Sequence, residues 1–225
     1  MAKTGFFHHV GTFFLFAATI LLIVTCISAP VVHKLALLKV KIGDESHAVT
    51  FGTFGHCQNV DNGDDICSKS RVGYSPAYVM AAAAGTTFSD KAADSTRALT
   101  KAMILHPIAC GLNFIAFLVS LGAGFVGSLL ASAVALTAFV VTAVACIIDF
   151  VLFSIVRHNI HDSDTGARAS YGPASWTLLV GAIFSLLGAI LLFFTCCSGR
   201  RSKNRGGVGK AEFGAAPRRR RFGRW

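Results

Sequence analysis

Four long segments without a single Lys or Arg constrain this chain more than any other feature of its sequence. They are approximately Val10–Ala29, Ala102–Leu121, Ser128–Ile148 and Ala174–Thr195. A helix needs about 20 apolar residues to cross the ~30 Å hydrocarbon core of a bilayer. Backbone groups in lipid must hydrogen-bond to one another, and a continuous apolar run does this as a helix. The sequence therefore predicts an all-α membrane protein with four transmembrane helices.

The composition supports this interpretation. Hydrophobic residues make up 53% of the 225-residue chain and charged residues only 14%, whereas soluble domains contain about a quarter charged residues.

The first segment follows Lys3 and so resembles a secretory signal peptide. Its apolar stretch is longer than the roughly 7–15 residues usual for a signal peptide, and Pro30 directly follows Ser28 and Ala29. We therefore expect it to be retained as a first span.

The spans divide the chain into consecutive segments with different expected surroundings. We expect a cytoplasmic N-terminus 1–9, a first span 10–29, an extracellular first loop 30–101 with a β-sheet and a helical extension, a second span 102–121, a cytoplasmic turn 122–127, a third span with an outer extension 128–156, an extracellular second loop 157–173, a fourth span 174–195 and a basic cytoplasmic tail 196–225.

The distribution of basic residues determines the expected orientation. From Ser198 onward there are ten basic residues and one acidic residue, Glu212, whereas the first loop contains eight basic and seven acidic residues. Segments rich in Lys and Arg remain on the cytoplasmic side of a membrane. Both termini are therefore expected in the cytoplasm, with the two longer loops outside.

The first loop is predicted to fold as a small β-sheet. Val31–Val40, Ala48–Phe54 and Cys67–Tyr74 have strand-like sequences, and Asn62-Gly63 is a strong hairpin signal between the last two.

A helix is predicted to follow these strands. Thr87-Phe88-Ser89-Asp90 has capping-box spacing, and Asp90–Thr100 should continue as a helix directly into the second span. Pro107 should kink that span.

Cys57 and Cys67 are the only cysteines in the first loop. On an oxidising side of the membrane their spacing favours a disulfide across a hairpin. The closed ring of about 11 residues would contribute roughly 2–3 kcal/mol. The alternative is a zinc site formed by these cysteines with His47 and His56, which the lack of CxxC spacing disfavours.

The residues before Cys57 resemble those of a known family. The stretch is Phe51-Gly52-Thr53-Phe54-Gly55-His56-Cys57, with nine residues before Cys67. It resembles the first-loop signature of claudin-like four-span proteins, in which Phe51, Gly52, Phe54 and Gly55 are the signature residues. It is most similar to the fungal PalI family of pH-response regulators, relatives of the claudin-like eisosome proteins. Arg97–Pro107 and Asp149–Phe153 add to the likeness. Animal claudins have Trp where this chain has Phe54, which argues against junction-type adhesion.

The resemblance implies a claudin-like four-helix bundle with a small disulfide-pinned extracellular β-sheet, in the plasma membrane. It also implies an accessory protein of fungal ambient alkaline-pH signalling, which helps a seven-span PalH-type receptor to reach or remain at the surface. An alternative of a different class is an organiser of plasma-membrane microdomains of the eisosome type, acting through self-association and lipid binding. A third alternative is an auxiliary subunit of a channel or transporter.

His106 and Asp149 are the ionisable residues within or bordering the last three spans. A carboxylate at mid-bilayer costs roughly 2.5–3.5 kcal/mol. Asp149 is therefore expected either to pair with His106 as a structural contact or to lie in headgroup water. Five other histidines are expected outside, where protonation near pH 6.5 could tune the loops. We favour ordinary surface histidines for these positions, which are His33, His47, His56, His158 and His161.

The end of the fourth span and the tail suggest contact with lipid. Cys196 and Cys197 have the juxtamembrane position typical of palmitoylation, the alternative being reduced thiols. Basic residues there attract anionic lipid at about 1 kcal/mol each, and those nearest the span are Arg200, Arg201, Lys203 and Arg205. The same attraction explains Arg218–Arg221 without nucleic-acid binding.

Two further expectations concern assembly and chemistry. Gly127, Ala131 and Ala135 recur at helix-packing spacing, which serves either packing within the bundle or contact with a partner helix, such as that of a homo-oligomer. The sequence has no HExxH, GxSxG, P-loop or redox CxxC motif. We therefore expect a protein that is not an enzyme and needs no cofactor or metal.

Overall fold

The computed structural model describes residues 6–32, 34–43, 47–59, 65–122, 125–163 and 165–208, with the side chains of 125, 126, 128 and 196–208 left aside. The helices are α1 (Phe6–Cys26), α2 (Pro76–Ala84), α3 (Asp90–Lys101), the 3-10 helix η1 (Ala102–Ile104), α4 (Leu105–Leu121), α5 (Phe125–Asp162) and α6 (Pro173–Val208). The strands are β1 (Leu38–Ile42), β2 (His47–Phe51), β3 (His56–Asn59), β4 (Asp65–Cys67) and β5 (Arg168–Tyr171).

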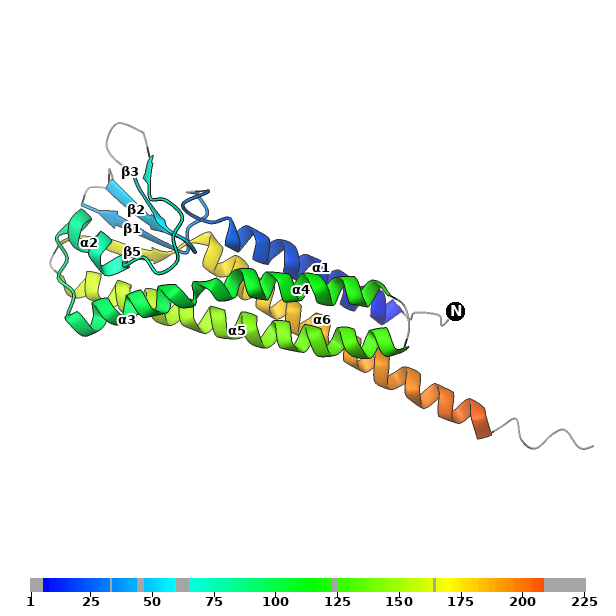
Figure 1. Ribbon diagram of the computed structural model, residues 1–225. Coiled ribbons are helices and arrows are strands. Elements are labelled where there is room, and N and C mark those ends of the chain that lie inside the picture. Colours follow the sequence, from blue (N-terminus) through cyan, green and yellow to red (C-terminus); the bar gives the residue numbers. More distant parts are fainter. Residues whose placement is uncertain are drawn as a thin grey trace, which may run out of the picture.

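Long helices form a bundle with a small sheet at one end (Figure 1). Four stretches of the described residues are long and apolar enough to cross a membrane, namely Phe6–Cys26, Asp90–Leu121, Leu129–Asp162 and Pro173–Thr195. The claudin-like four-helix fold expected from the sequence is therefore confirmed, and the chain is a multi-pass membrane protein. The first helix begins at Phe6, before the predicted Val10. It ends at Cys26 rather than at Ala29, because the chain turns there and the Ala29 N–H donates to the Leu35 carbonyl.

The second span is approached by a helix that changes geometry at its entrance. Helix α3 begins at Asp90, as expected, and Ser89 caps it, since its hydroxyl accepts a hydrogen bond from the Ala92 N–H at 3.3 Å. Asp90 then lies in the first turn, where a negative charge is favourable. The 3-10 turn η1 separates α3 from α4 directly before Pro107, whose ring and missing N–H disfavour a regular α-helix there.

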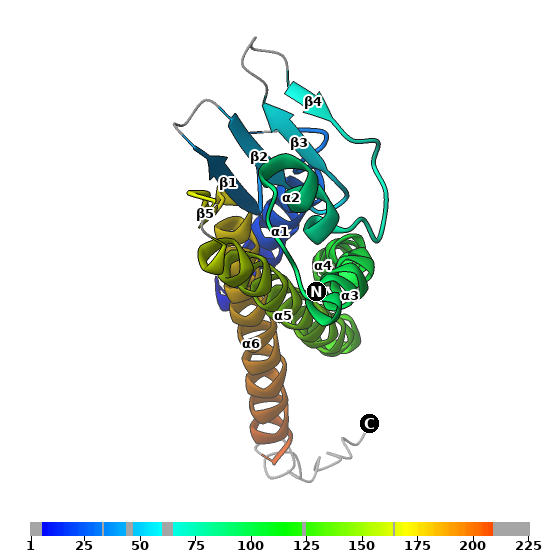
Figure 2. The ribbon, with the colours of Figure 1, turned by 90° about the vertical axis from the view of Figure 1, so that its left-hand side faces the viewer.

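The sheet is antiparallel, with strand order β4-β3-β2-β1-β5. Figure 2, viewed from the sheet end, shows the strands lying to one side of the helices. Side chains alternate along β1 and β2, so Leu38, Val40, Val49 and Phe51 are buried. They pack with residues of α2 and α5, including Met80. None of the described helices covers the opposite face of the sheet (Figure 2).

Three features of this region differ from the sequence expectation. The predicted strand Cys67–Tyr74 is wrong: β4 ends at Cys67, and the chain continues without regular structure to Tyr74. Helix α2, rich in alanine, was not predicted. Strand β5 belongs to the second loop and pairs with β1 from Leu38↔Tyr171 to Lys41↔Arg168.

The interior of the bundle is built from small residues. Ala116, Ala131, Ala135 and Ala189 are fully or almost fully buried and surround Leu15. Small side chains let helices approach closely in lipid, where dispersion replaces the hydrophobic driving force. The stripe that includes Ala131 and Ala135 is therefore occupied by packing within the chain.

Candidate functional site at the junction of sheet and bundle

The first-loop signature forms the turn between β2 and β3, against the chain that leaves α1. A Cβ on Gly52 would collide with the Ala29 backbone, and one on Gly55 would lie 2.5 Å from the Ser68 hydroxyl. Gly52 N–H donates to the Gly55 carbonyl at 2.8 Å. Glycine is required at Gly52 because backbone approaches it closely, and a side chain at Gly55 would displace Ser68. Phe51 is fully buried below the turn.

Three hydroxyl residues join this turn to the end of α1. The Thr53 hydroxyl donates to the Thr25 carbonyl at 3.0 Å, and the Thr53 N–H donates to the Ser28 hydroxyl at 3.0 Å. Since the Thr53 hydrogen is committed to Thr25, the Ser28 hydroxyl donates to Thr53 Oγ1 at 3.1 Å. The sequence reasoning missed this network, although the Thr and Ser spacing at the end of an apolar helix was a usable signal for capping.

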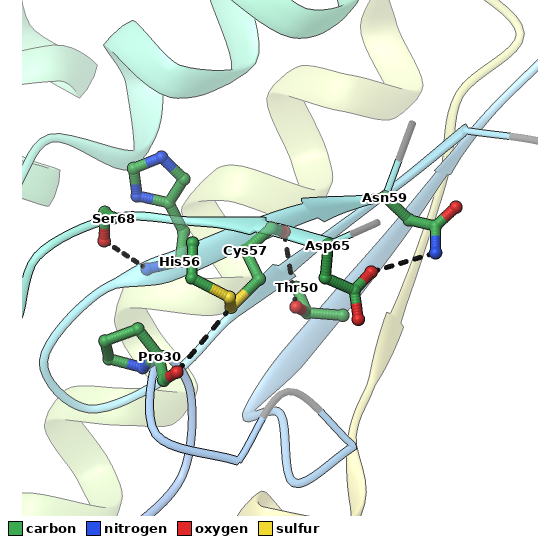
Figure 3. Close-up of a disulfide and its surroundings, with 8 residues drawn as sticks. Pro30, Thr50, His56, Cys57, Asn59, Asp65 and Ser68 are labelled. Carbon is green, nitrogen blue, oxygen red and sulfur yellow. Dashed lines mark hydrogen bonds between the residues drawn. A yellow bond between two sulfur atoms is a disulfide. The ribbon is translucent and has the colours of Figure 1, made fainter. Parts of the chain in front are cut away.

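The predicted disulfide between Cys57 and Cys67 is present (Figure 3). The two cysteines are opposite one another on β3 and β4. The Cys57 sulfur also lies 3.9 Å from the Pro30 carbonyl, a van der Waals contact because a disulfide sulfur carries no hydrogen. The bridge uses both sulfurs that the zinc alternative requires. Among the described residues, no group of three His, Cys, Asp or Glu side chains could hold a metal.

Tyr74 lies beneath the sheet and connects it to α3. Its hydroxyl donates to the Gly52 carbonyl at 2.8 Å, and its own carbonyl accepts from the Thr100 hydroxyl at 2.6 Å. Its ring is almost parallel to that of Phe51, with 6.4 Å between centroids. Burial, and secondarily the Asp149 carboxylate, raise the pKa of Tyr74, so its hydroxyl remains a donor. The irregular segment after β4, predicted as a strand, brings Tyr74 to this position.

His56 completes the aromatic group at the junction. Its ring centroid lies 6.2 Å from that of Phe51 and 6.0 Å from that of Tyr74. Burial lowers the pKa of His56, because desolvation disfavours the charged imidazolium. Its Nδ1 has no hydrogen-bond partner among the described residues. Protonation of His56 would therefore place a positive charge among partly buried aromatic rings.

His106 and Asp149, the two polar residues singled out in the spans, are brought together. His106 Nε2 lies 3.0 Å from Asp149 Oδ2, and the two side chains are 0% and 3% exposed. His106 Nδ1 lies 2.9 Å from the Met103 carbonyl. That carbonyl is the one that loses its helical donor because residue 107 is proline. His106 thus contacts both the carbonyl that Pro107 leaves without a helical donor and the buried carboxyl group of Asp149.

The protonation of this pair follows from its geometry. A carbonyl can only accept, so His106 Nδ1 carries a hydrogen. One further proton must lie between Nε2 and Oδ2, whether the pair is imidazolium with carboxylate or neutral imidazole with carboxylic acid. Both forms have zero net charge, which reduces the cost of burying the pair. Asp149 Oδ1 has no hydrogen-bond partner among the described residues.

A second polar group lies deeper in the bundle and joins α4, α5 and α6. The Ser185 hydroxyl donates to Asn113 Oδ1 at 2.8 Å, and Asn113 Nδ2 donates to the Ala109 carbonyl at 3.0 Å and to the Thr142 hydroxyl at 3.4 Å. These side chains are fully buried and satisfy one another, which indicates a structural role.

The remaining predicted site residues lie on the last part of α6, whose side chains are outside the described ones. They are Cys196, Cys197, Arg200, Arg201, Lys203 and Arg205. Palmitoylation and contact with anionic lipid at these positions stay predictions.

Comparison with known proteins identifies a family and a relative with similar sequences. The model of the SUR7/PalI family matches residues 7–188. The pH-response regulator protein palI/RIM9 of Pyricularia oryzae is 30% identical over 144 residues, which is 61% of this chain and 18% of that protein. The chain thus spans under a fifth of the length of this curated relative. Since the family match runs from α1 into α6 and includes the whole junction, the protein belongs to the SUR7/PalI family.

Proposed function

We propose that this protein is a non-catalytic regulator of the response to ambient alkaline pH, and that it supports the surface localisation or stability of a seven-span PalH-type receptor in the plasma membrane. One observation carries the proposal: the relative with 30% identity is a pH-response regulator. Membership of the SUR7/PalI family supports it further.

The proposed orientation has both termini in the cytoplasm and the sheet outside. Its support is the excess of Lys and Arg after Ser198, which would remain on the cytoplasmic side. An external sheet is also consistent with the Cys57–Cys67 disulfide, because disulfides persist in oxidising surroundings.

The proposed mechanism is presentation of a rigid surface to the receptor. Tyr74 joins the turn after β2 to α3, and Thr53 joins the same turn to the end of α1. The disulfide links β3 to β4, and the His106–Asp149 pair links α4 to α5. Together these contacts hold one arrangement of sheet and helices. A receptor that contacts both the sheet and the helices would bind more tightly, because this protein would lose little conformational entropy on binding.

The first experiment measures the surface level of a tagged receptor with and without this protein, at about pH 5 and about pH 8, on either side of the histidine titration range. We expect loss of surface receptor at both pH values when the protein is deleted, as for a stabiliser. An unchanged level at both pH values would contradict the proposal.

A pair of cysteine variants then tests the role of the junction. Cys57→Ser should be retained inside the cell and should lower surface receptor as deletion does. Cys146→Ala removes a free cysteine buried in the bundle and should leave receptor level unchanged. Normal delivery of Cys57→Ser to the surface would argue against the proposed role of the junction.

A further inference from the structure

The face of the sheet that carries no helix is hollowed into a groove of about 570 Å³. The register places Lys39 beside Thr50 on β2 and Ser170 on β5, and Asn59 beside Asp65 at the other edge. Lys34, in the chain between α1 and β1, and Pro173, the first residue of α6, also line the groove. The groove therefore extends across the sheet from the start of a membrane-spanning helix.

One end of the groove is positively charged. Lys34 and Lys39 are both exposed, and no ion pair joins either ammonium group to another described residue. The acidic residue of the lining, Asp65, lies on β4 at the far edge, where its Oδ1 accepts a hydrogen bond from Asn59 at 2.9 Å. The lysines are thus available to a ligand with negative charge.

The wall beyond the lysines can accept hydrogen bonds. The Thr50 hydroxyl donates to the Cys57 carbonyl at 3.3 Å, and the Ser170 hydroxyl donates to the Lys39 carbonyl at 3.4 Å. Each oxygen therefore has its hydrogen engaged and its lone pairs free. Asn59 adds an amide carbonyl and a second N–H. Such a wall suits a ligand with hydroxyl groups better than one that ends in a methylated amine.

The groove opens where the bundle meets the membrane surface. Pro173 begins the apolar stretch Pro173–Thr195. In the chain between α1 and Lys34, Ile27 is 42% exposed and Val31 is 67% exposed, and we call these two apolar side chains the apolar track. At a membrane interface, lysines lay their aliphatic stems along apolar surface and keep their charged groups in water. A lipid beside the bundle can therefore reach the groove without leaving the bilayer.

We propose that this groove binds the headgroup of an anionic phospholipid that carries hydroxyl groups. The phosphate contacts Lys34 and Lys39, the headgroup hydroxyls contact Thr50, Ser170 and Asn59, and an acyl chain follows Ile27 and Val31. An acidic segment of another protein would match the lysines, but it would not use the apolar track.

The test uses the full-length protein, purified in detergent and titrated with phosphatidylinositol or phosphatidylcholine, with bound lipid counted by native mass spectrometry. Lys34→Gln with Lys39→Gln is compared with Lys69→Gln with Lys91→Gln, two exposed lysines of the same loop that do not line the groove. Each lysine contributes about fivefold to affinity for anionic lipid. The groove variant should bind phosphatidylinositol about 25-fold more weakly, and the matched control should bind as the parent does.

A second variant tests the groove by volume rather than by charge. Ala48→Trp, on the floor of the groove, should also weaken phosphatidylinositol binding while both lysines remain. The basic tail is identical in every variant, so its own contacts with lipid cancel in the comparison.

Three results would overturn the proposal. The first is phosphatidylinositol binding that survives both the lysine and the Ala48→Trp substitutions. The second is equal displacement of the lipid by inorganic phosphate, which would indicate a simple phosphate site. The third is a poly-glutamate peptide that binds the groove more tightly than phosphatidylinositol, which would assign it to a protein segment.

Discussion

The sheet end and the deeper part of the bundle are stabilised in different ways. At the sheet end, specific bonds dominate: the Cys57–Cys67 bridge, the Tyr74 hydroxyl on Gly52, and the buried pair of His106 and Asp149. Deeper in the bundle, alanines and glycines allow close packing, and a Cβ on Gly188 would lie 2.8 Å from Leu15.

The difference follows from the two solvents. A sheet of short strands has too little apolar surface to be stable alone, so covalent and polar contacts supplement its burial. Helices in lipid already make their backbone hydrogen bonds internally, so their association depends on how closely their side chains pack. Substitutions at the sheet end should therefore cost more than those deep in the bundle, and the predictions below test that expectation from the largest effect to the smallest.

The largest effect is expected from Asp149→Ala. It leaves His106 buried without its partner, and breaking a buried ion pair by removing one member costs about 3–5 kcal/mol. Denaturant titration in detergent micelles measures the free energy of unfolding. Thr137→Ala, at an exposed position of the same helix, should change it little. The double variant His106→Leu with Asp149→Leu should lose less free energy of unfolding than Asp149→Ala. A larger loss would show that the unpaired His106 does not explain the effect of Asp149→Ala.

Loss of the disulfide should come next. Cys57→Ser with Cys67→Ser should lower the free energy of unfolding by roughly 2–3 kcal/mol, because the unfolded chain is no longer cross-linked. Reducing agent should lower the stability of the parent protein by the same amount and leave the double variant unchanged. Equal sensitivity of both proteins to the reducing agent would contradict this account.

Tyr74→Phe should have an intermediate effect. The ring remains under the sheet, but the buried Gly52 carbonyl loses its donor, which costs about 1–3 kcal/mol. Tyr78→Phe is the matched control, since Tyr78 is 77% exposed on α2. Thermal unfolding of both variants measures the difference, and equal melting temperatures would refute the role of the Tyr74 hydroxyl.

Asn113→Leu tests the deeper part of the bundle. Polar contacts between helices in lipid contribute on average about 0.6 kcal/mol and at most about 1.7 kcal/mol, so the variant should unfold only slightly more easily. If Asn113→Leu lowered the free energy of unfolding as much as Asp149→Ala does, the sheet end and the deeper bundle would not differ in the way described.

The smallest effect concerns pH. The pKa of His56 in the folded protein is lowered from 6.5 by burial. Well above pH 6.5 the residue is neutral in both states and has no effect. As pH falls from 6.5 toward the lowered pKa, the unfolded chain binds the proton first, so stability decreases. His56→Gln should flatten this decrease, whereas His161→Gln, at the exposed end of α5, should not.

Much of this architecture could be predicted from the sequence. The spans follow from apolar runs, and the cysteine bridge follows from two cysteines around a hairpin signal. Strand β5 could not be predicted because Arg168–Tyr171 is short and carries no strong pattern. It is a strand because β1 lies beside it.

Side-chain contacts at the junction were predictable only in part. His106 and Asp149 were recognised because ionisable residues are rare in apolar segments. Tyr74 and Thr53 were missed, since their roles depend on where the chain returns after β4 and after α1.

The pairing of β1 with β5 has a consequence for synthesis of the protein. Leu38 and Tyr171 are partners in the register, and the chain between them contains α2 to α5. During translation β1 can pair with β2 early, but its other edge stays open until β5 has been made, after the second and third spans. The Ser175 hydroxyl then donates to the Leu37 carbonyl at 2.7 Å, next to the strand pair. A nascent chain that stops before β5 would therefore present an unpaired strand edge, which is a template for pairing with another chain.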